Sequence, residues 1–410
     1  MSAVKRFLSG HRIFFGLFAF LLVYEAVIGN ALAPWRVNDH FFVFFTVDFS
    51  LGFCTKLLPG AVYRMIFKES DYNTATVCSV ILLVLFFISL CVFLEKLIKR
   101  TDERDRSICL FAVLLFITGP ASFSLFVSWL GVIDVYWILI SMLVFICMTK
   151  KQLWFLIPPL LVACVFVHYG AMICYIPMML IMLLIKLTHC EDKKDRRLLW
   201  TVFCLGAALS AGFTLYFMIN EHSNLVYPDE EFDRIVKERG AKYTYYYDYN
   251  FYKNITDESG KVIGDYINEG SRISSVIRTV AAQIKVTLAL RLKADSLREF
   301  IVGIIALLPA AACMASVFLK RAFDKTAPVL QRIVCALPPL LFVGSFVLSM
   351  LFSSDDFRWL THAFLPLAAA FMYYAYHEGE KVWRPLRERL PCAPCLAVYY
   401  ILYAALAFSA

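Results

Sequence analysis

Long apolar runs alternate with short polar stretches along most of the chain. A helix needs about 20 apolar residues to cross a bilayer, and many of the runs approach that length. The pattern predicts eleven membrane spans, at residues 12–33, 74–95, 108–120, 131–149, 153–170, 171–188, 198–219, 299–320, 333–352, 359–377 and 394–410. We therefore expect an all-α, polytopic integral membrane protein.

Two segments fit neither a span nor a short loop. Residues 34–73 contain an apolar run at 41–45 that is too short to cross a bilayer, which predicts interfacial helices in the first outer loop. Residues 220–298 are polar and predict a small extracytoplasmic subdomain. The chain then divides into an N-terminal membrane module at 1–219, this outer loop, and a C-terminal membrane module at 299–410.

Composition strengthens the membrane prediction. Residues of the set AVILMFWYC make up 60% of the 410 residues and charged residues only 18%. Soluble domains have about 45–50% apolar and about 25% charged residues. A soluble enzyme of this length would have no place for so much apolar surface, because single cores stop growing at roughly 250–300 residues.

The positive charge records orientation. With the N-terminus in the cytoplasm, the predicted inner segments hold 23 of the 40 Lys and Arg residues and the short outer loops hold 5. Basic residues concentrate on the cytoplasmic side of membrane proteins. We expect a bacterial inner or plasma membrane location, with the 220–298 loop and the C-terminus outside. The net charge of +8 then indicates no nucleic-acid partner.

Ionisable groups at the outer ends of the predicted spans are the candidates for chemistry. Such groups are costly near hydrocarbon and are functional candidates by default. They form four clusters on the predicted outer face: Asp48; Asp134; His168; and Asp355, Asp356 and Arg358 with His362. No Walker loop, dinucleotide fingerprint, zinc-peptidase motif or nucleophile elbow occurs in the sequence.

These residue types suit transfer from a lipid-phosphate donor. A carboxylate can remove a proton from an acceptor hydroxyl, and Arg and His can bind the phosphate leaving group. Lys56, Arg64 and Lys68 fall within one arc of a predicted surface helix and would help to hold an anionic headgroup. No metal site is predicted, although a divalent metal is left open.

Structural roles are open for the same residues. Asp48 can cap or interrupt a surface helix, and Asp134 can cap the fourth span. Arg358 can pair with Asp355 or Asp356. His168 can bond a turn carbonyl, and the basic arc can anchor a helix at lipid headgroups.

The layout resembles the GT-C superfamily of polyprenyl-phosphate-dependent glycosyltransferases, which have an acidic residue and surface helices in the first outer loop. Residues 48–53, 131–134 and 355–359 are also similar to segments of poorly characterised bacterial polytopic proteins associated with surface-polysaccharide biosynthesis. The resemblance implies Asp48 as catalytic base, with Arg358 and His168 as phosphate ligands. It implies a polyprenyl-phosphate-linked sugar as donor and an extracytoplasmic glycan or lipid-linked glycan as acceptor.

Three other functions remain open. An O-antigen-type polymerase also has many spans and a large outer loop, and it uses a lipid diphosphate donor. A lipid or glycan transporter or flippase would use polar groups near the bilayer midplane, where Glu25 is the candidate. A non-catalytic subunit of an envelope complex is the third. The sugar, the acceptor and the oligomeric state are not predicted.

Overall fold

The computed structural model describes residues 10–32, 36–118, 130–220, 224–242, 281, 284, 294–352, 356–390 and 393–406. Secondary structure in these residues is helical, apart from one isolated bridge between Gly52 and Leu225. The all-α prediction is therefore confirmed for the described part of the chain. Of the predicted outer loop at 220–298, the stretch from 243 to 293 lies outside these residues except for 281 and 284.

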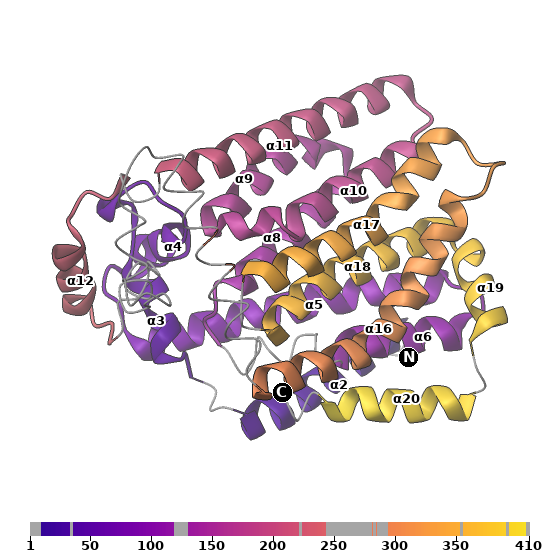
Figure 1. Ribbon diagram of the computed structural model, residues 1–410, viewed down its shortest axis with the longest axis horizontal. Helices are drawn as coiled ribbons and strands as arrows, with labels where there is room; N and C mark the ends of the chain where they lie inside the picture. Colours follow the sequence, from indigo (N-terminus) through magenta and orange to yellow (C-terminus); the bar gives the residue numbers. More distant parts are fainter. Residues whose placement is uncertain are drawn as a thin grey trace.

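The first half of the bundle contains α2 (Arg12–Leu32), α3 (Asp39–Thr46), η1 (Phe49–Leu51), α4 (Leu57–Phe67), α5 (Tyr72–Arg100), α6 (Arg106–Thr118), α8 (Asp134–Thr149), η2 (Lys151–Leu156), α9 (Ile157–Val167), η3 (Tyr169–Met172) and α10 (Tyr175–Thr188). The second half contains α11 (Lys193–Asn220), α12 (Asp229–Glu238), α16 (Ala294–Ala322), α17 (Val329–Phe352), α18 (Asp356–Glu378), α19 (Glu380–Arg389) and α20 (Ala393–Leu406). The long helices form one bundle, with α3, α4 and α12 at one end and α19 at the other (Figure 1).

A helix occupies each of the eleven ranges predicted as spans. Among the described residues, four helices are long and apolar enough to cross a membrane, at Tyr72–Arg100, Lys193–Asn220, Ile301–Ala322 and Val329–Leu348. Several other apolar helices, such as α8 and α10, are shorter, with 10–17 residues. Membrane association is indicated by these four helices, whereas the count of eleven and the orientation stay predictions.

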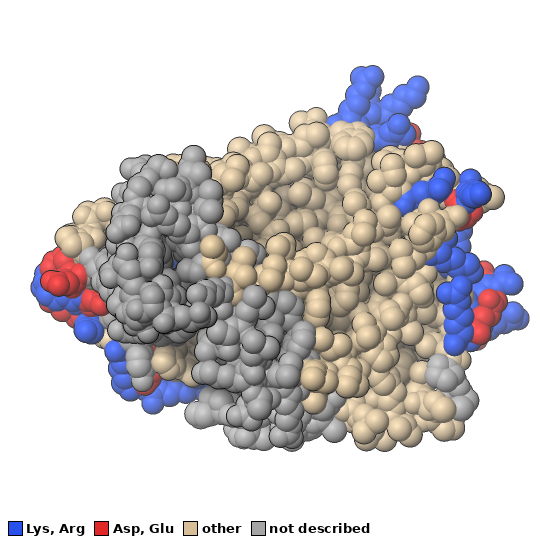
Figure 2. Space-filling view, in the orientation of Figure 1, with Lys and Arg blue, Asp and Glu red and all other residues tan. Residues whose placement is uncertain are grey.

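Charge on the visible surface lies at the two ends of the bundle. Lys and Arg side chains gather around α12 and α3 at one end and around the opposite ends of the long helices, while the described surface between them on this face lacks charge (Figure 2). Large apolar side chains are exposed along this middle zone, including Ile305 at 66% and Leu340 at 65%. An apolar surface of this kind marks contact with a membrane or a partner.

The predicted N- and C-terminal modules pack against each other within the bundle. α10 packs on α17 and α18, and α5 also contacts α18. The side chains of Trp137, Phe87 and Phe364 are fully buried in the resulting core. The start of α18 is thereby held next to the start of α8, which matters for the site described below.

The first outer loop folds back on itself at Gly60. Asn38 caps α3 by accepting the backbone N–H of His40, and α4 then packs across the end of α3. A Cβ atom added to Gly60 would lie 1.9 Å from the carbonyl oxygen of Val47 and 2.5 Å from that of Phe44. Only glycine permits this approach of α4 to the backbone that leads into Asp48.

Gly60→Ala is therefore expected to lower the free energy of unfolding by about 1–3 kcal/mol, the usual cost of overpacking. Gly212→Ala is the control, because Gly212 lies in α11 with no atom within 4 Å of the added Cβ. That change should raise stability by roughly 0.5–1 kcal/mol. Chemical unfolding in detergent, followed by circular dichroism, measures both. Equal effects would contradict the packing of α4 on the end of α3.

Candidate functional site

Asp134, Arg358 and His362 form one buried cluster at the end of the bundle that carries α3 and α4. Arg358 donates to Asp134 through two nitrogens, with Nε 2.6 Å from Oδ2 and Nη2 3.0 Å from Oδ1. His362 Nε2 lies 3.1 Å from the same Oδ2 atom. The Asp134 side chain is fully buried and that of Arg358 is 24% exposed. Arg358 is therefore the member of this cluster that is partly exposed.

The local structure explains why these three residues meet. Arg358 and His362 are four residues apart in α18 and so lie on one face of the helix. Asp134 is the first residue of α8, and Ile133 rather than Asp134 occupies the capping position. The capping role considered for Asp134 is therefore wrong, because its carboxylate is bound by Arg358.

Two aromatic residues that the sequence analysis missed complete the surroundings of His362. The Tyr175 hydroxyl lies 2.8 Å from His362 Nδ1. The Trp137 ring lies 5.3 Å from the His362 ring and 5.8 Å from the His168 ring, measured between centroids. Trp137 is three residues after Asp134, and residues at that spacing share a helix face, which is the one signal that could have found it. Its buried Nε1 has no hydrogen-bond partner in the described structure.

His168 and Lys56 lie next to this cluster and connect it to the first outer loop. The backbone N–H of Lys56 donates to the carbonyls of Phe166 and Val167, both at 3.0 Å, at the end of α9. His168 Nδ1 accepts the backbone N–H of Gly170 at 2.9 Å, which places the proton of the neutral ring on Nε2. Lys56 and Arg358 are near enough for their charges to act on the His168 ring.

Asp48 belongs to a second cluster at the same end. Arg64 Nε lies 2.6 Å from Asp48 Oδ2, and Arg239 Nη1 lies 3.2 Å from the same atom. The other carboxylate oxygen accepts the backbone N–H of Ser50 at 2.9 Å and also the Ser50 hydroxyl. The Asp48 side chain is 18% exposed. Asp48 thus caps the η1 turn, as one of the structural alternatives anticipated, and it also binds two arginines.

Ionisation of Asp48 is favoured in this arrangement. Partial burial raises its pKa, but the hydrogen bonds from Ser50 and the charges of Arg239 and Arg64 outweigh that effect, so the pKa lies below its usual value. The ion pairs therefore contribute stability above the ordinary aspartate pKa of about 3.9 and lose it as the pH falls further. At neutral pH, Asp48 is a carboxylate that can accept a proton, although its low pKa makes it a weak base while both arginines hold it.

Arg239 was not among the candidates from sequence. It follows α12 in the polar segment, where no periodic pattern marks it, and it also donates to the carbonyl of Thr46 at 2.9 Å. The neighbouring loop is tied to the first outer loop, because Phe53 N–H donates to the carbonyl of Asn224 and Val226 N–H donates to that of Leu51. The first outer loop and residues 224–242 thus form one cap over this end of the bundle (Figure 1).

The structure separates the predicted basic arc. Lys56 and Lys68 flank α4 with positive φ angles of 66° and 55°, so neither continues its helical backbone. Lys56 contacts the end of α9, whereas Arg64 binds Asp48. The expected single arc of Lys56, Arg64 and Lys68 is therefore wrong, because a helical face needs continuous helical backbone.

The other predicted site residues are only partly described. Asp355 lies outside the described residues, and Asp356 begins α18 with a side chain that is not described. Pairing of Arg358 with Asp355 or Asp356 was one structural alternative, and the partner that the described residues show is Asp134. Asp39, another acid of the first outer loop, pairs with Lys242 at 2.7 Å.

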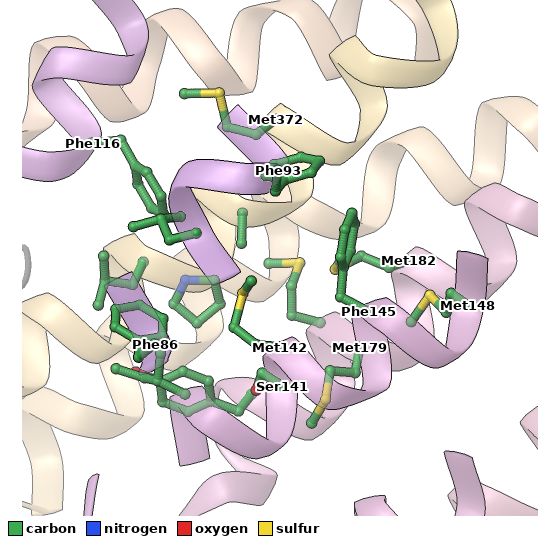
Figure 3. A pocket seen from close by; sticks show the side chains of 17 residues that line it. Phe86, Phe93, Phe116, Ser141, Met142, Phe145, Met148, Met179, Met182 and Met372 are labelled. Carbon is green, nitrogen blue, oxygen red and sulfur yellow. The ribbon is translucent and has the colours of Figure 1, made fainter. Parts of the chain in front are cut away.

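An apolar cavity of about 90 Å³ lies on the inner side of the cluster, with Tyr175 among its lining residues. Methionines and phenylalanines crowd this cavity, including Met142, Met179, Met182 and Phe145 (Figure 3). An apolar cavity of about 150 Å³ holds one benzene. The present cavity is therefore too small for a lipid chain.

Comparison of the chain with protein-family models, curated proteins and solved structures finds no match. In the described part of the chain, no three His, Cys, Asp or Glu side chains are grouped to hold a metal ion. The described side chains that gather at this end of the bundle are carboxylates, guanidinium groups, a lysine and imidazoles.

Proposed function

We propose that the chain is a polytopic protein of a bacterial inner membrane and acts there as a glycosyltransferase. It would move a sugar from a polyprenyl-phosphate donor to an extracytoplasmic glycan or lipid-linked acceptor. The observation that supports this best is that three segments bring their charged and polar groups to one end of an apolar bundle: Asp48 and Lys56 come from the first outer loop, His168 from the turn after α9, and Arg358 from α18.

In the proposed reaction, the Asp48 carboxylate takes the proton of the acceptor hydroxyl. The acceptor oxygen bonds to the anomeric carbon as the bond from that carbon to the phosphate oxygen breaks. The lipid phosphate leaves with the bonding electron pair, and Arg358, Lys56 and His168 stabilise its charge. Asp134 and His362 would position Arg358, because Asp134 holds two of its nitrogens.

The two arginines on Asp48 suggest how the base becomes active. A donor phosphate that binds Arg64 or Arg239 would compete with the carboxylate for the same guanidinium groups. Loss of one ion pair moves the pKa of Asp48 back toward its ordinary value, which strengthens it as a base. Donor binding and activation of Asp48 would then be coupled.

Lys56→Asn is expected to weaken binding of polyprenyl monophosphate by at least about tenfold, since a hydrogen bond to a charged group is worth about 1.5–3 kcal/mol. Asparagine removes the charge and tolerates a positive φ. Lys68→Asn is the matched control, since Lys68 is exposed and also has a positive φ angle. Binding of a labelled polyprenyl phosphate to the detergent-solubilised protein measures both. Equal losses in the two variants would remove Lys56 from the phosphate site.

The convergence of Arg64 and Arg239 on one carboxylate favours a second candidate, the O-antigen-type polymerase. With Arg358 and Lys56, this end carries more cations than a single phosphate needs, and a lipid diphosphate would use more of them. The two proposals differ in their donor, so a donor comparison distinguishes them.

The transporter alternative rests on Glu25. Its carboxylate is fully buried, and neither oxygen has a hydrogen-bond partner in the described structure. Glu25 does not line the apolar cavity of Figure 3, so that cavity lends no support to transport. We therefore retain transfer as the proposed function.

A further inference from the structure

A polar pocket lies at the opposite end of the bundle, between the ends of α16, α18 and α19. Its volume is about 680 Å³. Lys320 and Arg321 line it from α16, and Lys381 and Arg384 line it from α19. The pocket and the proposed transfer site lie at opposite ends of the bundle, so the function of the pocket can be tested independently.

Positive charge exceeds negative charge in this pocket. The lining contains four basic side chains and two carboxylates, those of Asp324 and Glu388. Each carboxylate already binds an arginine, with Arg321 Nη1 2.6 Å from Asp324 and Arg384 Nε 3.1 Å from Glu388. Lys381 pairs with Glu378, just outside the lining, with Nζ 2.9 Å from Oε2. Lys320 is therefore the lining cation with no ion pair in the described structure, and the group of side chains keeps one excess positive charge.

Two of the basic groups retain donors for such a ligand. Lys320 is exposed, and no ion pair of its ammonium group is seen in the described structure. Arg321 uses Nη1 for Asp324 and Nη2 for Gln331, while its buried Nε has no hydrogen-bond partner in the described residues. The pocket thus offers the exposed ammonium group of Lys320, next to the partly exposed guanidinium group of Arg321.

The pocket lies where two candidate spans end. The apolar stretch of α16 ends at Ala322, and that of α17 begins at Val329. Val317 and Phe323 form apolar parts of the pocket wall, and Phe323 is 76% exposed. Val329, on the other side of the turn, is 68% exposed. Charged side chains meet the uncharged zone at this end of the molecule (Figure 2).

We propose that this pocket binds the headgroup of an anionic phospholipid from the inner leaflet. The phosphate would contact Lys320, Arg321 and Arg384, and the acyl chains would lie against Phe323 and Val329. Basic pockets between spans on the cytoplasmic side suit this ligand. A soluble phosphate would use the same cations but would gain nothing from the apolar wall. The proposal assumes that α16 and α17 cross the membrane with this end in the cytoplasm, and it does not depend on the transferase activity.

The test compares lipids with matched acyl chains on the purified full-length protein. Phosphatidylglycerol and phosphatidylcholine are titrated separately, and retained lipid is measured by native mass spectrometry. The wild type should retain phosphatidylglycerol in preference to phosphatidylcholine. Lys320→Gln with Arg384→Gln should weaken retention of phosphatidylglycerol by roughly thirtyfold, from about 1 kcal/mol for each basic residue. Lys193→Gln with Lys194→Gln, an equal charge change at the exposed start of α11, should alter it less than twofold.

Three outcomes would overturn the proposal. One is equal retention of the two lipids by the wild type, and another is unchanged retention by the Lys320 and Arg384 variant. The third is complete displacement of the lipid by millimolar inorganic phosphate, which would indicate a site for a free anion. If the double variant does not fold, Lys320→Gln alone carries the test, because this exposed lysine makes none of the ion pairs described above.

Discussion

Replacing Asp48 with asparagine is expected to lower the rate of sugar transfer by about 10²–10⁴-fold, the usual contribution of a general base. Asparagine has nearly the same shape, but it cannot accept the proton of an acceptor hydroxyl. It also lacks the charge that binds Arg64 and Arg239. The rate measured in proteoliposomes at saturating donor should fall while the protein remains folded and inserted.

Asp39→Asn is the matched control for that variant. Asp39 lies in the same loop and pairs with a single exposed cation, Lys242, so its replacement also removes one negative charge. Transfer by the Asp39 variant should stay within about twofold of the wild type. Full activity in Asp48→Asn would exclude Asp48 as the base, and equal losses in both variants would point to a general effect of loop charge.

Asp134→Ala is expected to lower the free energy of unfolding by about 3–5 kcal/mol. Removal of one partner of a buried ion pair leaves the other charge without compensation. In this protein the change leaves both Arg358 and His362 without their shared carboxylate, in surroundings where the Asp134 side chain is fully buried. Denaturant unfolding in detergent, followed by circular dichroism, measures the loss.

Asp71→Ala separates this effect from helix capping. Asp71 caps α5 by accepting the backbone N–H of Thr74, and its replacement should cost about 0.5–2 kcal/mol. Removing Asp134 and Arg358 together should cost less than removing Asp134 alone, because no unpaired guanidinium is then left. If Asp134→Ala costs no more than Asp71→Ala, the ion pair has no structural role beyond that of a cap.

Hydropathy predicted the positions of the helices well, because the apolar residues that mark a helix all lie within that helix's own stretch of sequence. Helix lengths were less predictable. The hairpin around His168 contains two short helices, α9 and α10, joined by the η3 turn. Lys56 and Lys68 also show how far sequence spacing can predict a helix. The predicted surface helix included both lysines, but their positive φ angles end the helix between them.

The partners of the candidate residues were harder to predict than their positions. Spacing along α18 placed Arg358 and His362 on one face, yet the carboxylate they share is 224 residues before Arg358. Arg239 reaches Asp48 only because residues 224–226 bind the first outer loop, and such backbone pairing leaves no pattern in side-chain type. Long-range packing therefore determines which carboxylate pairs with which arginine.

We propose above all that this end of the bundle transfers a sugar from a lipid monophosphate. The most direct measurement is transfer by the reconstituted wild-type protein from a panel of radiolabelled polyprenyl-monophosphate sugars, with a lipid-diphosphate oligosaccharide in parallel. We predict transfer from a monophosphate donor, none from the diphosphate donor, and loss of that transfer in Asp48→Asn. Transfer from the diphosphate donor alone, or transfer that persists in Asp48→Asn, would contradict the account.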